Sequence, residues 1–404
     1  MGVRSEVGFI ATLDGVRGVA IFWVMLFHFA ALRDAAGDPW VEALRQVPLL
    51  NAVIRNGYLG VDLFFLISGF LLPLPWFIHA RDGIAAPSAR RFYARRFWRI
   101  VPAYYLQLAI LFAVVLPLLL GAGYWKRDLY VIIANVLAHA AFLHNTSPLT
   151  SASMSVNGAL WTLAVEAQYY LLLPLLAPLF VRRPVAATAA AFAVAALWQF
   201  AARHDFDSMV AWQVALGAHW GWPESNVRQL LLTQLPDYLG HFALGMLLGR
   251  AWLAWRERET GPRRERMLLA GTALALAALL AYLGSGVAVW GEQTWILSAL
   301  CLGTLLFAAV AGRGPVVEAL LAKGPLALLG RISYSAYLYH LLALVVLIKF
   351  AGALAPGIVF PAFVAATVAL AWLSWRFVEQ PLMGVRGELR QKPVPDTQSV
   401  SDTR

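Results

Sequence analysis

Long apolar runs constrain the fold of this chain more than any other feature. A helix needs about 20 apolar residues to cross a hydrocarbon core of about 30 Å. Runs of this size occur near residues 12–32, 58–80, 97–121, 160–181, 185–202, 233–253, 267–285, 293–312, 326–349 and 357–377. Charged residues make up only 13% of the sequence, about half of their share in a soluble domain. We therefore predict an all-α, polytopic membrane helix bundle surrounded by the lipid bilayer.

Basic connectors predict the direction of the spans, because cytoplasmic loops contain an excess of Lys and Arg. Such residues gather within 81–99, at 182–183, within 256–266 and in the tail after residue 385. An even number of crossings must separate the first two of these segments, but three apolar runs lie between them. The shortest, residues 130–144, does not reach spanning length. We predict about ten transmembrane helices plus one re-entrant or interfacial helix at 130–144, with both termini cytoplasmic.

The chain shows no internal repeat and no second folded domain. We expect a membrane domain over residues 1–382 and a disordered cytoplasmic tail over residues 383–404, which are polar and contain proline. The first apolar run is too long and too interrupted by charge for a cleaved signal peptide, so it is expected to remain as a span. The net charge of +10 suits basic loops beside anionic lipid. Nucleic acid is not an expected partner, because no basic stripe interleaved with aromatic residues occurs.

Ionisable residues inside the apolar runs are the main functional signal, because hydrocarbon tolerates them only beside protein or a wet cavity. The first run reads LDGVRGVAIFWVMLFHF, where Arg17 and His28 lie eleven residues apart. On a helix they share one face at a separation of about 16 Å. Asp14 lies near the same line, and an i, i+3 ion pair with Arg17 is an alternative to a functional role. His28 is predicted to be a general base, since a neutral imidazole can accept a proton and return it.

Two further spans contain polar residues. Asp62 and Ser68 lie in GVDLFFLISGFLL, where glycines permit close approach of a neighbouring helix or a ligand. In LWTLAVEAQYYLLLP, Glu166 lies four residues before Tyr170. A buried carboxylate must be paired, protonated or hydrated, so Glu166 is a functional candidate, with a structural hydrogen-bonding role as the alternative.

The remaining candidates lie within the run near residues 326–349 and at the start of the third span. In RISYSAYLYHLLALVV, Ser333, Tyr337 and His340 share one helical stripe, and His340 is predicted at a depth similar to that of His28. Arg96 and Arg99 lie one turn apart where the third span enters the membrane. Guanidinium groups match phosphate oxygens, although arginines at helix ends also extend toward lipid headgroups. No metal-binding histidine pair, Gly-rich phosphate loop or Gly-x-Ser-x-Gly elbow occurs, so no bound metal is expected.

These blocks together resemble the integral-membrane acyltransferase 3 family of bacterial sugar and antibiotic O-acyltransferases. Six of them occur in order along the chain: LDGVRGVAIFWVMLFH, GVDLFFLISGFLL, RRFWRIVPAYYL, LWTLAVEAQYYLLLP, ISYSAYLYH and RFVEQP. The resemblance implies that Arg17 and His28 are an essential pair and that Arg96 and Arg99 contact acyl-CoA. It also implies that Glu166 belongs to the site.

The resemblance implies a reaction as well. An acyl group, by default acetyl, would pass from cytoplasmic acyl-CoA to a sugar hydroxyl in a cell-surface glycan or a glycosylated metabolite such as a macrolide. The enzyme would lie in the bacterial inner membrane and act alone or with a separate periplasmic protein. His28 and Glu166 are the expected catalytic residues. The expected coenzyme-binding residues are Arg17, Arg96 and Arg99, and the expected substrate or supporting residues are Asp14, Asp62, Ser68, Tyr170, Tyr337 and His340.

Two positions differ from the usual form of the family. Ala167 stands where a second acidic residue is common, and Gln234 stands where an arginine is frequent. Both differences bear on the recognition of the acceptor. The alternative function is proton-coupled transport or flipping of a lipid-linked sugar, because intramembrane Asp, Glu and His also mark transporters.

Overall fold

The computed structural model describes residues 10–126, 129–151, 157–205, 230–258, 261–285, 295–312 and 317–383, with a few single positions between 206 and 229. Every regular element in this part of the chain is a helix, which confirms the all-α prediction. The polar tail was expected at 383–404, of which residues 384–404 lie outside the described residues.

The helices alternate long apolar segments with short turns. The first half of the chain contains α2 (Thr12–Ala35), α3 (Pro39–Arg45), α4 (Pro48–Arg55), α5 (Leu59–Leu71), α6 (Leu74–Asp82), α7 (Ala89–Ile110), η1 (Leu111–Val115), α8 (Leu116–Leu120), α9 (Ala122–Trp125), α10 (Leu129–Ala140), η2 (His144–Thr146), α11 (Pro148–Ser151), η3 (Gly158–Leu160), α12 (Trp161–Arg182) and α13 (Pro184–His204). The second half contains α16 (Leu235–Arg256), α17 (Pro262–Gly284), α18 (Trp295–Ala311), η4 (Glu318–Lys323), α20 (Pro325–Arg331), α21 (Ser333–Ala351), α22 (Pro356–Ser374) and η5 (Trp375–Glu379).

Eight helical segments of the described residues are long and apolar enough to cross a membrane. They are Thr12–Ala35, Leu59–Asp82, Ala89–Leu120, Gly158–Arg182, Pro184–His204, Pro262–Gly284, Ser333–Ala351 and Pro356–Met383. The other two predicted spans correspond to α16, which contains polar residues along its length, and to α18, which has 17 residues. The number of ten spans and the side of each terminus stay predictions. The predicted short helix at 130–144 is observed as the 12-residue α10.

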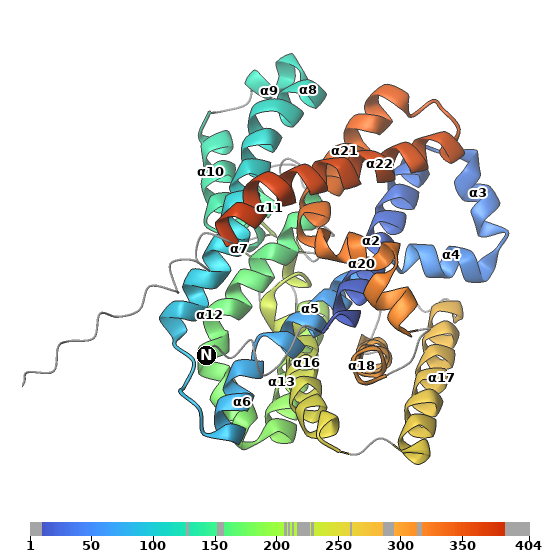
Figure 1. The fold of residues 1–404 in the computed structure, drawn as a ribbon. Coiled ribbons are helices and arrows are strands. Elements are labelled where there is room, and N and C mark those ends of the chain that lie inside the picture. Colours follow the sequence, from blue (N-terminus) through green and yellow to red (C-terminus); the bar gives the residue numbers. More distant parts are fainter. Residues whose placement is uncertain are drawn as a thin grey trace, which may run out of the picture.

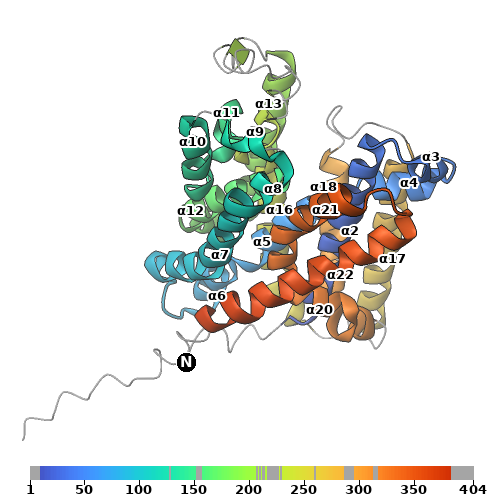
Figure 2. The ribbon, with the colours of Figure 1, turned by 90° about the horizontal axis from the view of Figure 1, so that it is seen from above.

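Helices α5 and α16 lie in the centre of the molecule, as Figures 1 and 2 show. In both views α7, α10 and α12 lie on one side of this centre, and α3, α4 and α17 lie on the other. Helix α2 packs against α5, α20 and α21. The candidate polar residues of α2 therefore face helices from both halves of the sequence.

Glycines bring the central helices into backbone contact, which is the use expected of small residues between membrane helices. A Cβ atom on Gly69 of α5 would lie 2.2 Å from the carbonyl oxygen of Phe242 on α16. A Cβ atom on Gly60 would lie 2.4 Å from the carbonyl oxygen of Ala20 on α2. Of the two uses predicted for these glycines, the structure shows the approach of a neighbouring helix.

Because α2 and α20 are in backbone contact at Gly330, we expect a substitution there to reduce stability strongly. A Cβ atom on Gly330 would lie 1.6 Å from the carbonyl oxygen of Asp14, so any side chain must push α20 away. We expect Gly330→Ala to lower the free energy of unfolding by about 1–3 kcal/mol, as overpacking usually does. Thermal unfolding in detergent measures the effect. Gly357→Ala is the matched control, because no atom lies within 4 Å of its added Cβ; equal melting temperatures for both variants would contradict the close contact.

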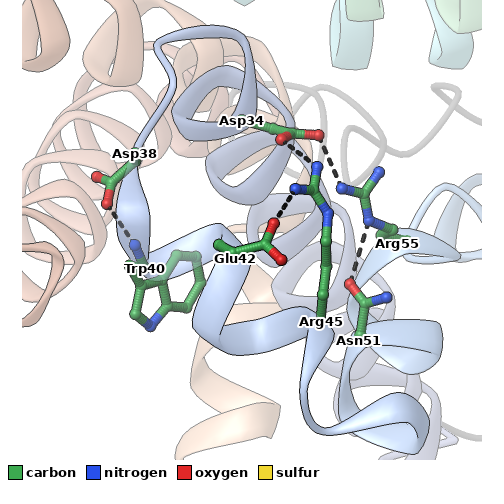
Figure 3. A network of polar contacts seen from close by, with 7 residues as sticks. All are labelled: Asp34, Asp38, Trp40, Glu42, Arg45, Asn51 and Arg55. Atoms are coloured by element: carbon green, nitrogen blue, oxygen red, sulfur yellow. Dashed lines mark hydrogen bonds and ion pairs between the residues drawn. The ribbon is translucent and has the colours of Figure 1, made fainter.

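A polar network holds the far end of α2 against α3 and α4 (Figure 3). The Asp34 carboxylate accepts hydrogen bonds from Arg45 at 2.8 Å and from Arg55 at 2.7 Å. Buried Arg33 pairs with Asp38 and donates to the carbonyl oxygen of Gly352 in the connection between α21 and α22. This end of α2 is therefore anchored to α21, which contains His340.

Candidate active site

Asp14 joins two arginines at the start of α2. Its carboxylate oxygens lie 3.6 Å from Nη1 of Arg17 and 3.5 Å from Nε of Arg331. The i, i+3 pair is therefore present, and it is part of a larger arrangement. Arg331 ends α20, and the close contact of Gly330 with α2 places it beside Asp14.

Two arginines of α7 lie at the same end of the site. The guanidinium carbon of Arg96 lies 6.0 Å from the ring centres of Phe92 and Tyr170, within the range of cation–π contacts. Its buried Nε has no hydrogen-bond partner among the described residues. Arg99 lies within electrostatic reach of Arg17 and of Arg96. We call Arg17, Arg96, Arg99 and Arg331 the arginine cluster.

The carboxylates within reach of the arginine cluster are Asp14, Glu166 and Glu379, so arginines outnumber them among the described residues. Glu379 also accepts a hydrogen bond from Ser335. Excess positive charge at the edge of a hydrocarbon region is costly unless an anion balances it. The cluster therefore has the charge and the bidentate donors that suit phosphate groups.

Glu166 is the acceptor in a hydrogen-bonded group that joins α5 to α12. Its Oε1 accepts from the hydroxyl of Ser68 at 2.8 Å and from the hydroxyl of Tyr170 at 2.5 Å. Ser68 and Glu166 each keep part of their surface exposed although they face each other across two helices. Because Tyr170 also contacts Arg96, this group adjoins the arginine cluster.

The two candidate histidines of α2 and α21 meet in the structure, although 312 residues separate them. Nε2 of His340 lies 3.3 Å from Nδ1 of His28, and their ring centres are 5.0 Å apart. His340 is fully buried, whereas His28 is partly exposed. We call His28 and His340 the histidine pair.

Tyr337 connects the histidine pair to α12. Its ring centre lies 5.4 Å from that of His340. Its hydroxyl donates to the carbonyl oxygen of Ala159 at 2.9 Å and accepts from the hydroxyl of Thr162 at 2.8 Å. Thr162 lies one turn before Glu166 on α12. Polar groups therefore follow one another from the arginine cluster, through Glu166, to the histidine pair.

Asp62 lies apart from this arrangement. Its Oδ2 is 3.6 Å from Nε2 of His241 on α16. Both residues are buried, as is Asp237 one turn before His241. The structure therefore brings Asp62 to α16 and places it outside the set that includes Ser68 and His28.

Arg331 and Thr162 are site residues that the sequence analysis did not single out. Arg331 stands at the predicted start of a span, where an arginine usually indicates topology alone. Threonine hydroxyls in helices commonly bond to the backbone of their own helix. The sequence therefore gives no signal for the contact of Thr162 with Tyr337. No group of three His, Cys, Asp or Glu side chains that could hold a metal ion occurs in the part of the chain that the structure describes.

The chain is similar to known proteins over most of its length. A family model described as "Acyltransferase domain" (Acyl_transf_3) matches residues 10–376. Nodulation protein 10 of Rhizobium leguminosarum bv. viciae is 29% identical over 393 residues, which cover 93% of this chain and 94% of that protein. No solved structure matches the chain.

Two further relatives have names that describe a product or an activity. Exopolysaccharide production protein ExoZ of Rhizobium meliloti is 29% identical over 345 residues, which cover 83% of this chain and 92% of that protein. Peptidoglycan O-acetyltransferase OatA of Listeria monocytogenes is 24% identical over 390 residues, which cover 93% of this chain. The chain spans 56% of the length of that O-acetyltransferase.

Proposed function

This chain belongs to the acyltransferase 3 family, and on that premise we propose that it transfers an acyl group from acyl-CoA to a hydroxyl group of a sugar. The observation that supports this most is the histidine pair, because its member His28 lies on the same helix as Arg17. The imidazole of His28 lies about 16 Å along α2 from Arg17 of the arginine cluster, which suits phosphate. Acyl-CoA is long and narrow, with phosphates at one end and a thioester at the other, so one donor molecule can reach both the arginine cluster and His28.

The donor binds, in this proposal, with its phosphates at the arginine cluster. The unpartnered Nε of Arg96 and the excess of arginines over carboxylates both favour an anion there. The narrow arm of the coenzyme extends past Ser68 and Glu166 toward His28. These three residues are only partly buried, which supports a path along them.

His28 acts as the general base of the transfer step. It removes the proton of the acceptor hydroxyl while the hydroxyl oxygen attacks the thioester carbonyl carbon. The new carbon–oxygen bond forms, the carbon–sulfur bond breaks, and the imidazolium returns the proton to the leaving thiolate. Glu166 holds the hydroxyls of Ser68 and Tyr170 beside the arm and partly balances the arginine cluster.

The names of the relatives support a class of acceptor. Their names refer to nodulation, to an exopolysaccharide and to peptidoglycan. We infer a sugar of the cell envelope or of a secreted product as the acceptor, reached from the outer side of the bacterial inner membrane, and acetyl as the acyl group. A glycosylated metabolite such as a macrolide is the other acceptor within this class, and a separate periplasmic protein is the alternative acyl carrier.

The direct test uses the purified protein in lipid nanodiscs with acetyl-CoA. We expect CoA release that depends on added acceptor sugar, with acetyl esters on that sugar detected by mass spectrometry. Mass spectrometry of surface glycans and secreted metabolites from a strain lacking the gene identifies the native acceptor. Movement of a sugar across the membrane without CoA release would contradict the enzyme and favour the transporter.

Substitution of Arg331 is expected to have a modest effect on the KM for the donor. Its side chain is 49% exposed, and exposed charge pairs contribute little. We expect Arg331→Gln to raise the KM for acetyl-CoA about two- to fivefold, the factor of a weak exposed pair. The KM for acetyl-pantetheine, which lacks the nucleotide, should not change. An equal rise for both donors in steady-state kinetics would place Arg331 outside the phosphate site.

A further inference from the structure

The partners of each ring nitrogen in the histidine pair determine where the hydrogens lie. Nδ1 of His340 is 2.8 Å from the carbonyl oxygen of Tyr337, which can only accept a hydrogen bond. Nδ1 of His340 must therefore carry the hydrogen. In the neutral ring, Nε2 of His340 then has a free lone pair and acts as an acceptor.

The same argument extends to His28. Its Nδ1 lies 3.0 Å from the carbonyl oxygen of Val24 and 3.3 Å from Nε2 of His340. Both neighbours are acceptors, so Nδ1 of His28 carries the hydrogen and shares it between them. Nε2 of His28 is then unprotonated, and no described residue forms a hydrogen bond with it.

We propose that His340 is a positioning residue that holds His28 in the Nδ1–H tautomer, so that Nε2 of His28 is the atom that removes the acceptor's proton. The proton-transfer part of this inference rests on the proposed function, whereas the tautomer does not. When Nε2 takes the proton, the Nδ1–H bond to His340 becomes charge-assisted and stronger. The bond therefore stabilises the transition state more than the bound substrates, which raises kcat.

A neutral hydrogen-bond acceptor suits the position of His340 better than a carboxylate does. The aromatic rings in contact with the pair belong to Phe27 and Tyr337, and His340 has no exposed surface. A carboxylate in such surroundings would have to be desolvated as an ion, at a large cost. An imidazole orients its partner and stabilises the cation that forms without introducing a second buried charge.

The kinetic test compares two substitutions of similar size. His340→Leu removes the hydrogen-bond acceptor of Nδ1 of His28. We expect it to lower kcat about 10- to 100-fold, the factor of one lost hydrogen bond to a charged group. The KM values of donor and acceptor should stay near those of the wild type. His340→Gln offers an amide oxygen to Nδ1 of His28 and should restore kcat to within a few-fold. His139→Leu, which removes a buried imidazole on α10, is the control and should leave kcat within a few-fold.

Nitrogen NMR of isotope-labelled histidine tests the tautomer without any assay of activity. The signal that is lost in His28→Gln should show a protonated Nδ1 and an unprotonated Nε2 in the wild type. In His340→Leu the carbonyl oxygen of Val24 is the one acceptor left for Nδ1–H, so that signal should show a larger fraction of the Nε2–H tautomer than in the wild type. In His340→Gln it should resemble the wild type.

The outcomes separate the two proposals. Equal kcat values for His340→Leu and the wild type, or an unchanged tautomer of His28 in His340→Leu, would overturn the positioning role. An equal loss in the Leu and Gln variants would also overturn it, because a lost acceptor could not explain both. Full activity of His28→Ala would instead overturn the proposed base. In that case the tautomer result would still stand.

Discussion

Purified His28→Ala is expected to lose acceptor-dependent CoA release by a factor on the order of 10² to 10⁴, the usual contribution of a general base. Of the two histidines in the pair, His28 is the one with accessible surface, and its Nε2 has no partner among the described residues. The KM for acetyl-CoA should change little, because the arginine cluster remains intact. Steady-state kinetics in nanodiscs, at matched protein concentration and melting temperature, measures both quantities.

The control for this prediction is His204→Ala. His204 ends α13 and is exposed, and its ring centre lies 4.5 Å from that of Phe200. Its substitution removes an imidazole outside the site and should leave the rate unchanged. If His28→Ala kept a tenth or more of the wild-type rate while remaining folded, the base would have to be another group.

The second large effect is expected from Arg96→Gln. Its guanidinium lies at 6.0 Å from two aromatic rings and is oriented by them, and its Nε is buried without a partner. We expect the KM for acetyl-CoA to rise about 10- to 100-fold, the factor of a lost hydrogen bond between charged groups. Arg96→Lys should recover only part of the affinity, because an ammonium group does not bind phosphate in a bidentate manner.

Two comparisons make this prediction specific. Acetyl-pantetheine, which lacks the nucleotide phosphates, should show the same KM with the wild type and with Arg96→Gln. Arg91→Gln removes the same charge from the exposed face of α7 and should leave the KM for acetyl-CoA near the wild-type value. A parallel rise for both donors would indicate that Arg96 supports the fold of α7 and not the phosphates.

The local part of the site could be predicted because helix geometry is local. The spacing of Arg17 and His28 places them on one face of α2, and the spacing of Glu166 and Tyr170 allows the hydrogen bond that the structure shows. The same periodicity allowed the ion pair of Asp14 and Arg17. The length and apolar character of the runs determined that the protein is a helix bundle.

The sequence by itself therefore determined the helices, their apolar surfaces and the residues that share a face on each of them. Only the tertiary structure decided which faces meet. His28 contacts His340, and Ser68 contacts Glu166. Asp14 pairs with Arg331, and Asp62 lies beside His241. These pairs join helices that are distant in the sequence. Their relative rotation is set by packing, above all where glycines such as Gly69 and Gly330 let two backbones touch, and no local periodicity contains that information.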